Sequence, residues 1–214
     1  MATVRATLIG DVVGSRAVGD RGRLHAALTE ELARLNGGDA PAPVVPLRVT
    51  VGDEYQGCFG TVGDALRAAL RLRLALAPYA EVRHGVGWGA VGVLSEEPRV
   101  EDGPGWWAAR EAIEAVHRAE GRPASRSLRT AYAPADGVEG PAPAAVNAAL
   151  VARDELVARL DATGLSVLDG MLAGMTQQQI ASRLGVSPSA VSQRVRRGGL
   201  GSIVRVDELL GELA

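Results

Sequence analysis

Residues 44–59, VVPLRVTVGDEYQGCF, hold two strand-like runs on either side of a short polar segment, and they are the clearest indication of the fold. Residues 44–51 are rich in valine, and Tyr55 and Phe59 bound the second run, a composition typical of strands. Gly52, Asp53 and Glu54 stand between the runs, and glycine and aspartate favour turns. We therefore predict a β-hairpin with Asp53 at its turn.

The segments on both sides of the hairpin alternate between strand and helix patterns. A strand-length apolar run ends at Gly10-Asp11, and a later run rich in valine and glycine predicts a strand whose backbone lies close to another element. Strands and helices are predicted, in turn, over residues 3–9, 20–36, 44–51, 55–59, 61–78, 81–94, 104–120 and 127–132. This order extends the ferredoxin-like pattern and predicts an α+β fold with an antiparallel sheet.

Composition restricts the class of protein. The chain has 214 residues, 47% of them hydrophobic, as in globular proteins. It has no secretory-signal pattern and no run of about 18 uninterrupted apolar residues. A single cysteine, Cys58, excludes an intrachain disulfide and agrees with a reducing compartment, so we expect a cytoplasmic protein without a membrane partner. All 23 basic residues are arginines, which excludes a Walker A lysine, a lysine Schiff base and a lysine general base.

The chain divides into two parts at a segment rich in proline, glycine and alanine, residues 133–145. We predict one domain over residues 1–135, a linker over 136–145 and a second domain over 146–214. Between Gly170 and Val206 the sequence has five arginines and no acidic residue. Contact with phosphates explains such a region directly.

Two aspartates are candidate metal ligands. In the predicted sheet, Asp11 ends the first strand and Asp53 sits at the hairpin turn, so the two carboxylates converge at one edge. Mg²⁺ binds carboxylate oxygens together with substrate phosphates, and Glu54 is a candidate third ligand. The alternative is that both aspartates are ordinary residues of Gly-Asp turns.

Four segments, in the same order, resemble the palm domain of class III nucleotidyl cyclases and, more loosely, that of diguanylate cyclases. They are residues 9–15 (IGDVVGS), 51–55 (VGDEY), 83–89 (RHGVGWG) and 103–111 (GPGWWAARE). The resemblance implies Mg²⁺ held by Asp11, Asp53 and the carbonyl of Val12, and Arg110 as the catalytic arginine. The chain departs from the pattern, since it has no base-recognising lysine and Trp106 replaces an expected asparagine. Trp106 either stacks on a base or fills the core.

Over nearly its whole length the chain is similar to the SatD family of bacterial proteins. The matching segments are IGDVVGSR (residues 9–16), GDEYQG (52–57), residues 102–111 and a C-terminal helix pair. Together the two resemblances imply a nucleotide site formed by Val12, Gly14, Ser15, Arg16, Gln56, Trp106 and Arg110.

Residues 175–197, MTQQQIASRLGVSPSAVSQRVRR, have the pattern of a helix-turn-helix. Thr176 caps a first helix that Gly185 ends, and Ser187 with Pro188 begins a second one. The motif resembles those of sigma factors and response regulators, and the alternative is a helix pair that only packs. The predicted DNA contacts are Thr176, Gln177, Ser187, Ser189, Ala190, Ser192, Gln193, Arg194, Arg196 and Arg197.

Further helices are predicted around this motif, over residues 147–160, 165–172 and 206–213, the last as a dimerisation helix. Because one small module usually binds DNA weakly, we expect a homodimer on paired half-sites of double-stranded DNA.

Three hypotheses follow from the sequence. The first, which we favour, is a transcriptional regulator whose degenerate cyclase-like domain binds a nucleotide or phosphorylated metabolite and thereby changes DNA affinity. The second is an active Mg²⁺-dependent nucleotidyl or phosphoryl transferase fused to a DNA-binding domain. The third is a DNA-binding protein whose N-terminal domain only dimerises.

Overall fold

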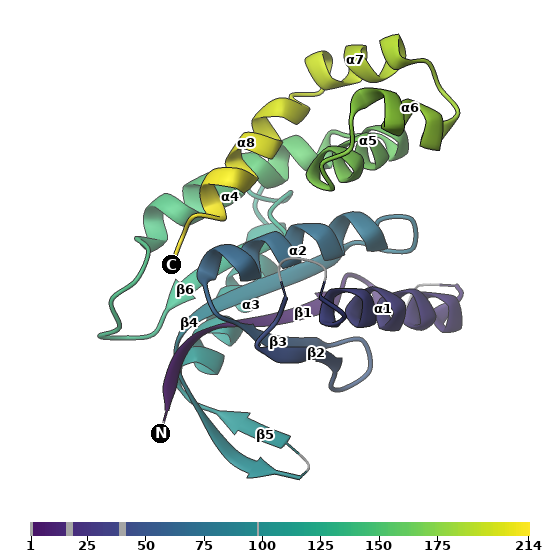
Figure 1. Cartoon of the computed structure of the whole chain (residues 1–214). Coiled ribbons are helices and arrows are strands. Elements are labelled where there is room, and N and C mark those ends of the chain that lie inside the picture. The colour runs from purple at the N-terminus through teal and green to yellow at the C-terminus, as the bar shows by residue number, and fades with distance from the viewer. Residues whose placement is uncertain (1, 16–18, 39–41, 98) are drawn as a thin grey trace.

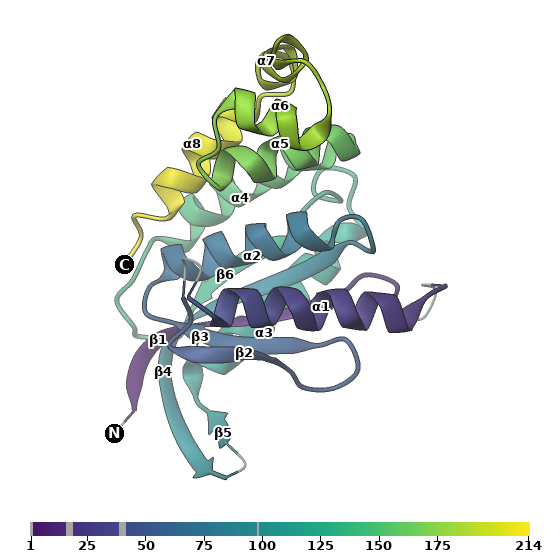
Figure 2. The same cartoon turned by 45° about the vertical axis from the view of Figure 1, so that its right-hand side comes forward.

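The computed structural model describes residues 2–15, 19–38, 42–97 and 99–214 (Figure 1). It consists of a sheet with helices on both faces. A further group of helices, formed by the C-terminal part of the chain, packs on the outer side of the helix layer on one face (Figure 2). The elements are β1 (Thr3–Val12), α1 (Arg21–Asn36), β2 (Val45–Val49), β3 (Tyr55–Phe59), α2 (Val62–Leu76), β4 (Val82–Glu96), β5 (Arg99–Asp102), α3 (Pro104–Glu120), β6 (Thr130–Pro134), α4 (Pro143–Ala158), α5 (Ala162–Leu172), α6 (Gln177–Leu184), α7 (Pro188–Arg197) and α8 (Leu200–Leu210).

The sheet has strand order β2-β3-β1-β4-β5 with β6 beside β4, and it is mixed rather than antiparallel as predicted, because β6 returns parallel to β4 after α3. β1 pairs antiparallel with both β3 and β4, whereas β6 runs parallel to β4. The predicted hairpin forms between β2 and β3, and the predicted order of elements from β1 to β4 is confirmed. The register pairs Gly10 with Tyr55 on one side and Asp11 with Arg83 on the other. The end of β1 therefore lies between the hairpin and β4.

The glycine-rich strand β4 lies against the backbone of α3, as its composition predicts. A Cβ atom at Gly85 or Gly87 would collide with backbone atoms of α3. Val82 and Val86, at alternate positions, belong instead to the core beneath α1 and α2. Because side chains alternate along a strand, α3 covers one face of the sheet and α1 and α2 cover the other (Figures 1 and 2).

Several bounds differ from the prediction. β5 is not predicted, because its four residues RVED carry no apolar run, and with the end of β4 it forms an arm that projects from the sheet (Figure 1). α4 begins at Pro143 rather than residue 147. α5 begins at Ala162 rather than residue 165, because the Asp161 carboxylate accepts a hydrogen bond from the Gly164 N–H and starts the helix earlier.

The last helix has other bounds than predicted. α8 spans Leu200–Leu210 rather than residues 206–213, and its apolar side, including Leu200 and Ile203, is buried by the same chain. Beyond it, the carbonyls of Ala214 and Leu213 accept hydrogen bonds from the N–H groups of Val62 and Gly63 at 3.3 and 3.1 Å. These contacts dock the C-terminal segment on the start of α2.

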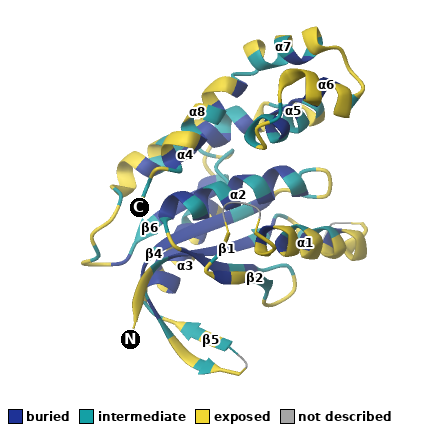
Figure 3. Cartoon of the chain, in the orientation of Figure 1, coloured by how far each residue is buried: buried dark blue, intermediate teal, exposed yellow. Residues whose placement is uncertain are grey.

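α2 contacts both the sheet and the C-terminal helices. Val146 and Leu150 of α4 share a core with β1 and α2, while Leu70 and Leu74 of α2 share a second core with α5 to α8. Figure 3 shows buried positions in the sheet, in α2 and on the inner sides of α4 and α8. No helix within the described ranges has the length and apolar character needed to cross a lipid bilayer.

Charged side chains are buried where α2, α4 and β6 meet. Asp154 is fully buried and accepts hydrogen bonds from the N–H groups of Arg129 and Thr130 at 2.7 and 2.8 Å. Its Oδ1 lies 3.2 Å from Nη1 of Arg73 and 3.1 Å from Nη2 of Arg153. We call Arg73, Arg153 and Asp154 the junction cluster. The cluster ties α4 to α2 and to the start of β6.

Candidate functional site

Asp11 and Asp53 come together at the end of β1. Asp53 follows Gly52 in the β2–β3 turn, where a φ of 65° favours glycine. The N–H of Val12 donates a hydrogen bond to Oδ2 of Asp53 at 3.3 Å, which fastens the turn to β1. Both carboxylates line a depression of about 590 Å³, the sheet-edge hollow, together with Val12, Gly14, Ser15, Val51, Glu54 and Arg83.

Both oxygens of the Asp11 carboxylate have partners. Nε of Arg83 donates to Oδ1 at 2.8 Å, and Nε2 of His117 lies 3.0 Å from Oδ2. Arg83 also donates through Nη1 to Glu120 at 2.9 Å. Since His117 and Glu120 belong to α3, this helix contributes polar groups to the site along with β1 and β4.

Glu54 and Arg110 form a two-point ion pair across the site. Nη1 and Nη2 of Arg110 donate to the two carboxylate oxygens of Glu54 at 2.9 and 2.8 Å. This hydrogen bonding raises the pKa of the Arg110 guanidinium. A phosphate on Arg110 must therefore exchange with Glu54, because both donors of the guanidinium edge are engaged.

The carboxylates, as placed, do not form a divalent-cation site. Within the described ranges, no group of three or more His, Cys, Asp or Glu side chains is arranged to hold a metal ion. Asp11 faces Arg83 and Glu54 faces Arg110, whereas Mg²⁺ needs several free oxygens in an octahedral arrangement. The predicted ligands Asp11, Asp53 and Glu54 do not fit the ion in this arrangement, and we derive no chemistry through a metal.

A second depression, of about 310 Å³, adjoins the first at the start of α1, and we call it the α1 hollow. The two share Val12, Ser15 and Asp53. Arg21 and His25 add basic groups, and leucines of α1 form an apolar wall. The two hollows together offer acidic, basic and apolar surface to one ligand.

The other predicted ligand-binding residues lie elsewhere. Gln56 is on β3, paired with Ile9, and lines neither hollow. Trp106 is only 7% exposed and packs with Ile9 and Val91. Of the two predicted roles, stacking on a base or filling the core, its position fits the second. Arg16 falls outside the described residues.

A buried tyrosine–histidine pair lies next to the end of β1. The hydroxyl of Tyr55 and Nε2 of His84 are 2.7 Å apart, and neither side chain reaches solvent. Burial, with smaller contributions from Arg153 and Arg73, lowers the pKa of His84 to about 3, so the ring is neutral. A Cβ atom at Gly10 would collide with the Tyr55 ring, so only glycine fits there.

The C-terminal helices α6 and α7 start at the predicted caps. Oγ1 of Thr176 accepts from the Gln179 N–H at 3.2 Å, and the Gln179 side chain accepts from the Thr176 N–H at 2.8 Å. Gly185, with φ 65°, ends α6, and Oγ of Ser187 accepts from the Ala190 N–H at 3.2 Å to start α7. Only residues 185–187 connect the two helices.

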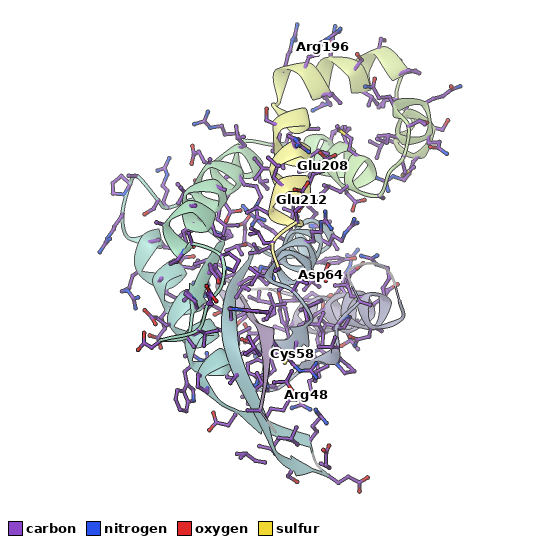
Figure 4. The ribbon with its side chains drawn as sticks, turned by 60° about the vertical axis from the view of Figure 1, so that its left-hand side comes forward. Arg48, Cys58, Asp64, Arg196, Glu208 and Glu212 are labelled. Carbon is purple, nitrogen blue, oxygen red and sulfur yellow. The ribbon has the colours of Figure 1, made fainter. Side chains whose placement is uncertain are left out.

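The predicted DNA-contacting residues lie mainly on the outer side of this helix pair. Val191 forms the buried side of α7, and Figure 4 shows Arg196 at the end of the molecule opposite to Arg48. Ala190, Ser192 and Arg194 are half-buried. The exposed members are Thr176, Gln177, Ser187, Ser189, Gln193, Arg196 and Arg197.

The three arginines that end α7 differ in their partners. Nη1 of Arg194 lies 2.7 and 2.8 Å from the two carboxylate oxygens of Asp161. Within the part of the chain that the structure describes, Arg196 and Arg197 have neither an ion pair nor a side-chain hydrogen bond. Two exposed positive charges on α7 are thus available to an external anion.

Sequence reasoning missed the polar groups around Asp11. His117 stands seven positions after Arg110, and Glu120 three positions later, so a helical wheel of α3 places them on one face. Arg83 follows from the pairing of β1 with β4, which the sequence alone does not fix.

Comparison with known proteins gives a family and several similar solved structures. The model of the SatD family matches residues 6–213 of this chain. A search among curated proteins finds no match.

The similar solved structures include two cyclases and one regulator. A bacterial light-regulated adenylyl cyclase has 13% identity and a TM-score of 0.43, and the match covers 62% of this chain and 43% of that one. This chain thus spans less than half of that cyclase. The active GGEEF domain of a diguanylate cyclase from Vibrio cholerae has 10% identity and a TM-score of 0.43, with coverages of 64% and 85%. A regulator of polyketide synthase expression from Bifidobacterium adolescentis has 14% identity and a TM-score of 0.26, with coverages of 98% and 85%.

Proposed function

The chain belongs to the SatD family, and from that premise we propose that it is a DNA-binding transcriptional regulator. In this proposal α6 and α7 bind double-stranded DNA as part of a homodimer. The sheet domain binds a nucleotide or another phosphorylated metabolite, and the bound ligand changes the affinity for DNA.

The unpaired arginines of α7 carry the proposal. Arg196 and Arg197 are exposed without ion-pair partners in the described chain, and they lie in a stretch of 37 residues, Gly170 to Val206, without a carboxylate. Guanidinium groups on a surface free of acids are suited to phosphates, since electrostatic attraction to the backbone supplies most non-specific affinity for DNA.

The connection between α6 and α7 supports the same function. A turn of about three to four residues between two helices is typical of the helix-turn-helix, whose second helix enters the major groove. On α7, Ser189 and Gln193 are exposed and carry side chains that can hydrogen-bond to base edges. We assign α7 as the recognition helix.

The two hollows at the end of β1 support a ligand in the sheet domain. Arg21 and His25 of the α1 hollow suit a phosphate, and the carboxylates of the sheet-edge hollow can accept hydrogen bonds from sugar hydroxyls. Asp11, Asp53 and Glu54 repel a bare phosphate in the sheet-edge hollow. For this reason each ligand is tested below both with and without Mg²⁺.

α2 supports the proposed coupling between the two regions. It packs on β1 and β4 with one side and on α5 and α8 with the other. A ligand changes DNA affinity only if it binds two arrangements of these helices with different affinity.

DNA binding is tested by fluorescence anisotropy on a labelled duplex of about three helical turns, over a series of salt concentrations. We expect binding that weakens with salt. Replacing both Arg196 and Arg197 by alanine should weaken it about tenfold or more and reduce the slope of log Kd against log salt by about two. Arg205→Ala is the matched control, because Arg205 is exposed but paired with Glu208 on α8. Equal losses in control and double variant contradict the proposal.

Ligand binding is tested by thermal shift with nucleoside triphosphates and cyclic and signalling nucleotides, each with and without Mg²⁺. A ligand that binds only the folded protein raises Tm by mass action. Asp11→Asn and Asp53→Asn should abolish the shift, and Asp169→Asn, on α5, should retain it. Absence of any shift in the wild type contradicts a nucleotide site.

Product analysis of the same samples separates a sensor from an enzyme. Turnover that Asp53→Asn abolishes would support the Mg²⁺-dependent transferase. Salt-dependent DNA binding without ligand or turnover would support a DNA-binding protein whose sheet domain only dimerises.

A further inference from the structure

A third depression, of about 490 Å³, lies beside α7 at the turn between α4 and α5, and we call it the α7 hollow. Four of its lining positions are on α7 at spacings of three, four and seven residues, so the hollow follows one stripe of the helix. The polar groups and the α7 stripe are Arg159, Asp161, Ala190, Gln193, Arg194 and Arg197.

Positive charge dominates this hollow. Three arginines and the carboxylate of Asp161 line it, and one of the arginines, Arg159, is paired with Glu155 at 2.8 Å. The Asp161 carboxylate holds Arg194 at 2.7 Å and also accepts a hydrogen bond from the Gly164 N–H at 2.7 Å, as the cap of α5. Both hydrogen bonds lower its pKa, so it is ionised at neutral pH. Arg197 has no partner in the described residues.

The hollow borders the outer face of α7. Val191 marks the buried side of the helix, and Gln193 lies two positions on, about 200° around the axis. Gln193 and Arg197 therefore belong both to the outer face and to the wall of the hollow. A duplex that lies across the outer face brings its sugar–phosphate backbone to the edge of α7, where the hollow opens.

We propose that the α7 hollow binds a phosphodiester group of duplex DNA, and that in the free protein the Asp161 carboxylate takes the place of that group on Arg194. This inference rests on the DNA binding proposed above. The side chains of Arg194 and Asp161 are 40% and 62% exposed, and ion pairs this exposed contribute little stability. Arg194 can therefore exchange Asp161 for a phosphate, and Asp161 weakens DNA binding by competing for it.

Asp161→Asn tests the exchange with little risk to the fold, because asparagine caps helices as well as aspartate does. In the anisotropy assay on the same duplex, we expect this variant to bind about three- to tenfold more tightly than the wild type. The slope of log Kd against log salt should steepen by about one, as expected for one additional phosphate contact. Adding Arg194→Ala to Asp161→Asn should remove the gain.

Asp169→Asn is the matched control. It removes the same charge from α5, and Asp169 is likewise paired with a half-exposed arginine, Arg183, at 3.2 Å. We expect it to change affinity by less than about twofold, since long-range screening reduces its effect on a distant phosphate. If Asp161→Asn binds no more tightly than Asp169→Asn, or binds more weakly than the wild type, the α7 hollow is not a phosphate site although the DNA function stands. If neither the wild type nor any variant binds the duplex, both proposals are overturned.

Discussion

Arginines occupy opposite environments in the junction cluster and on α7. Arg73 and Arg153 have 3% and 0% of their side chains exposed and share Asp154, whereas Arg196 and Arg197 are exposed without ion-pair partners in the described chain. A buried guanidinium must be paired because its transfer out of water is unfavourable, and an exposed one need not be. Because the chain has no lysine, arginine supplies both the cations of the internal ion pairs and the positive surface charge that we propose binds DNA.

A third group of arginines lies between these extremes. Arg83, Arg110 and Arg194 are each paired with a carboxylate but remain partly exposed. Such pairs can exchange partners, because water screens both charges once they separate. Of the three, Arg194 is the one at which we propose an external anion, and its pair with Asp161 is also the one with the most exposed carboxylate.

The largest effect is expected at the junction cluster. Asp154→Ala leaves Arg73 and Arg153 without their shared buried carboxylate, and two backbone N–H groups lose their acceptor. We expect the free energy of unfolding to fall by about 3 to 5 kcal/mol, measured by urea denaturation. Asp169→Asn, which breaks an exposed pair with Arg183, should lower it by less than about 1 kcal/mol. Similar losses in the two variants would remove the contrast between buried and exposed pairs.

A pH dependence should come from His84, which burial in the core, with smaller contributions from Arg153 and Arg73, keeps neutral. Its pKa is about 3 in the folded protein, against about 6.5 when unfolded, so only the unfolded chain gains this proton as the pH falls between these values. Stability is therefore lost as the pH falls below about 6.5. Between pH 7 and 4.5 the loss from this group should approach about 2 to 3 kcal/mol.

His84→Gln tests that contribution. The variant changes stability at neutral pH, but its stability should fall less steeply with acid than that of the wild type, measured by urea denaturation at each pH. If the stability of the variant and of the wild type fell equally with pH, the pKa of His84 would not be lowered in the folded protein.

A smaller effect is expected at the start of α6. Thr176→Ala removes the acceptor for the Gln179 N–H, which is one half of the capping box. We expect unfolding to become easier by about 1 kcal/mol, seen as a lower urea midpoint. Thr176→Ser keeps a hydroxyl acceptor and should retain most of the stability. A loss in the serine variant as large as in the alanine variant would argue against the cap.

The smallest effect on stability is expected on α7. Replacing Arg196 and Arg197 by alanine removes no ion pair within the described chain, so the free energy of unfolding should change by less than about 0.5 kcal/mol. The same double variant is expected to lose DNA affinity, which separates a binding role from a structural one. A loss of stability above about 1 kcal/mol would show that these arginines contribute to the fold.

Local pattern predicts most elements of this chain. The alternation and turn residues of 44–59 predict the hairpin, and the caps Thr176 and Ser187 predict the starts of two helices. The glycines of β4 predict the close approach of another backbone, which is that of α3. Each of these patterns depends on residues only a few positions apart, so it can be recognised without knowing the rest of the fold. Two features are not predicted. β5 has no apolar run, and the start of α8 has no side-chain cap, because Gly199 stands at that position.

The candidate site divides in the same way. The sequence alone determined that Asp11 and Asp53 end a strand and occupy a turn, and that the arginines of α7 lie in a region without acids. Which carboxylate each arginine meets depends on the folded chain, which pairs Arg83 with Asp11, Arg110 with Glu54 and Arg194 with Asp161. Strand register and helix packing bring these pairs together over 33 to 72 positions of the chain, and ion pairing depends on distance in space rather than along the sequence.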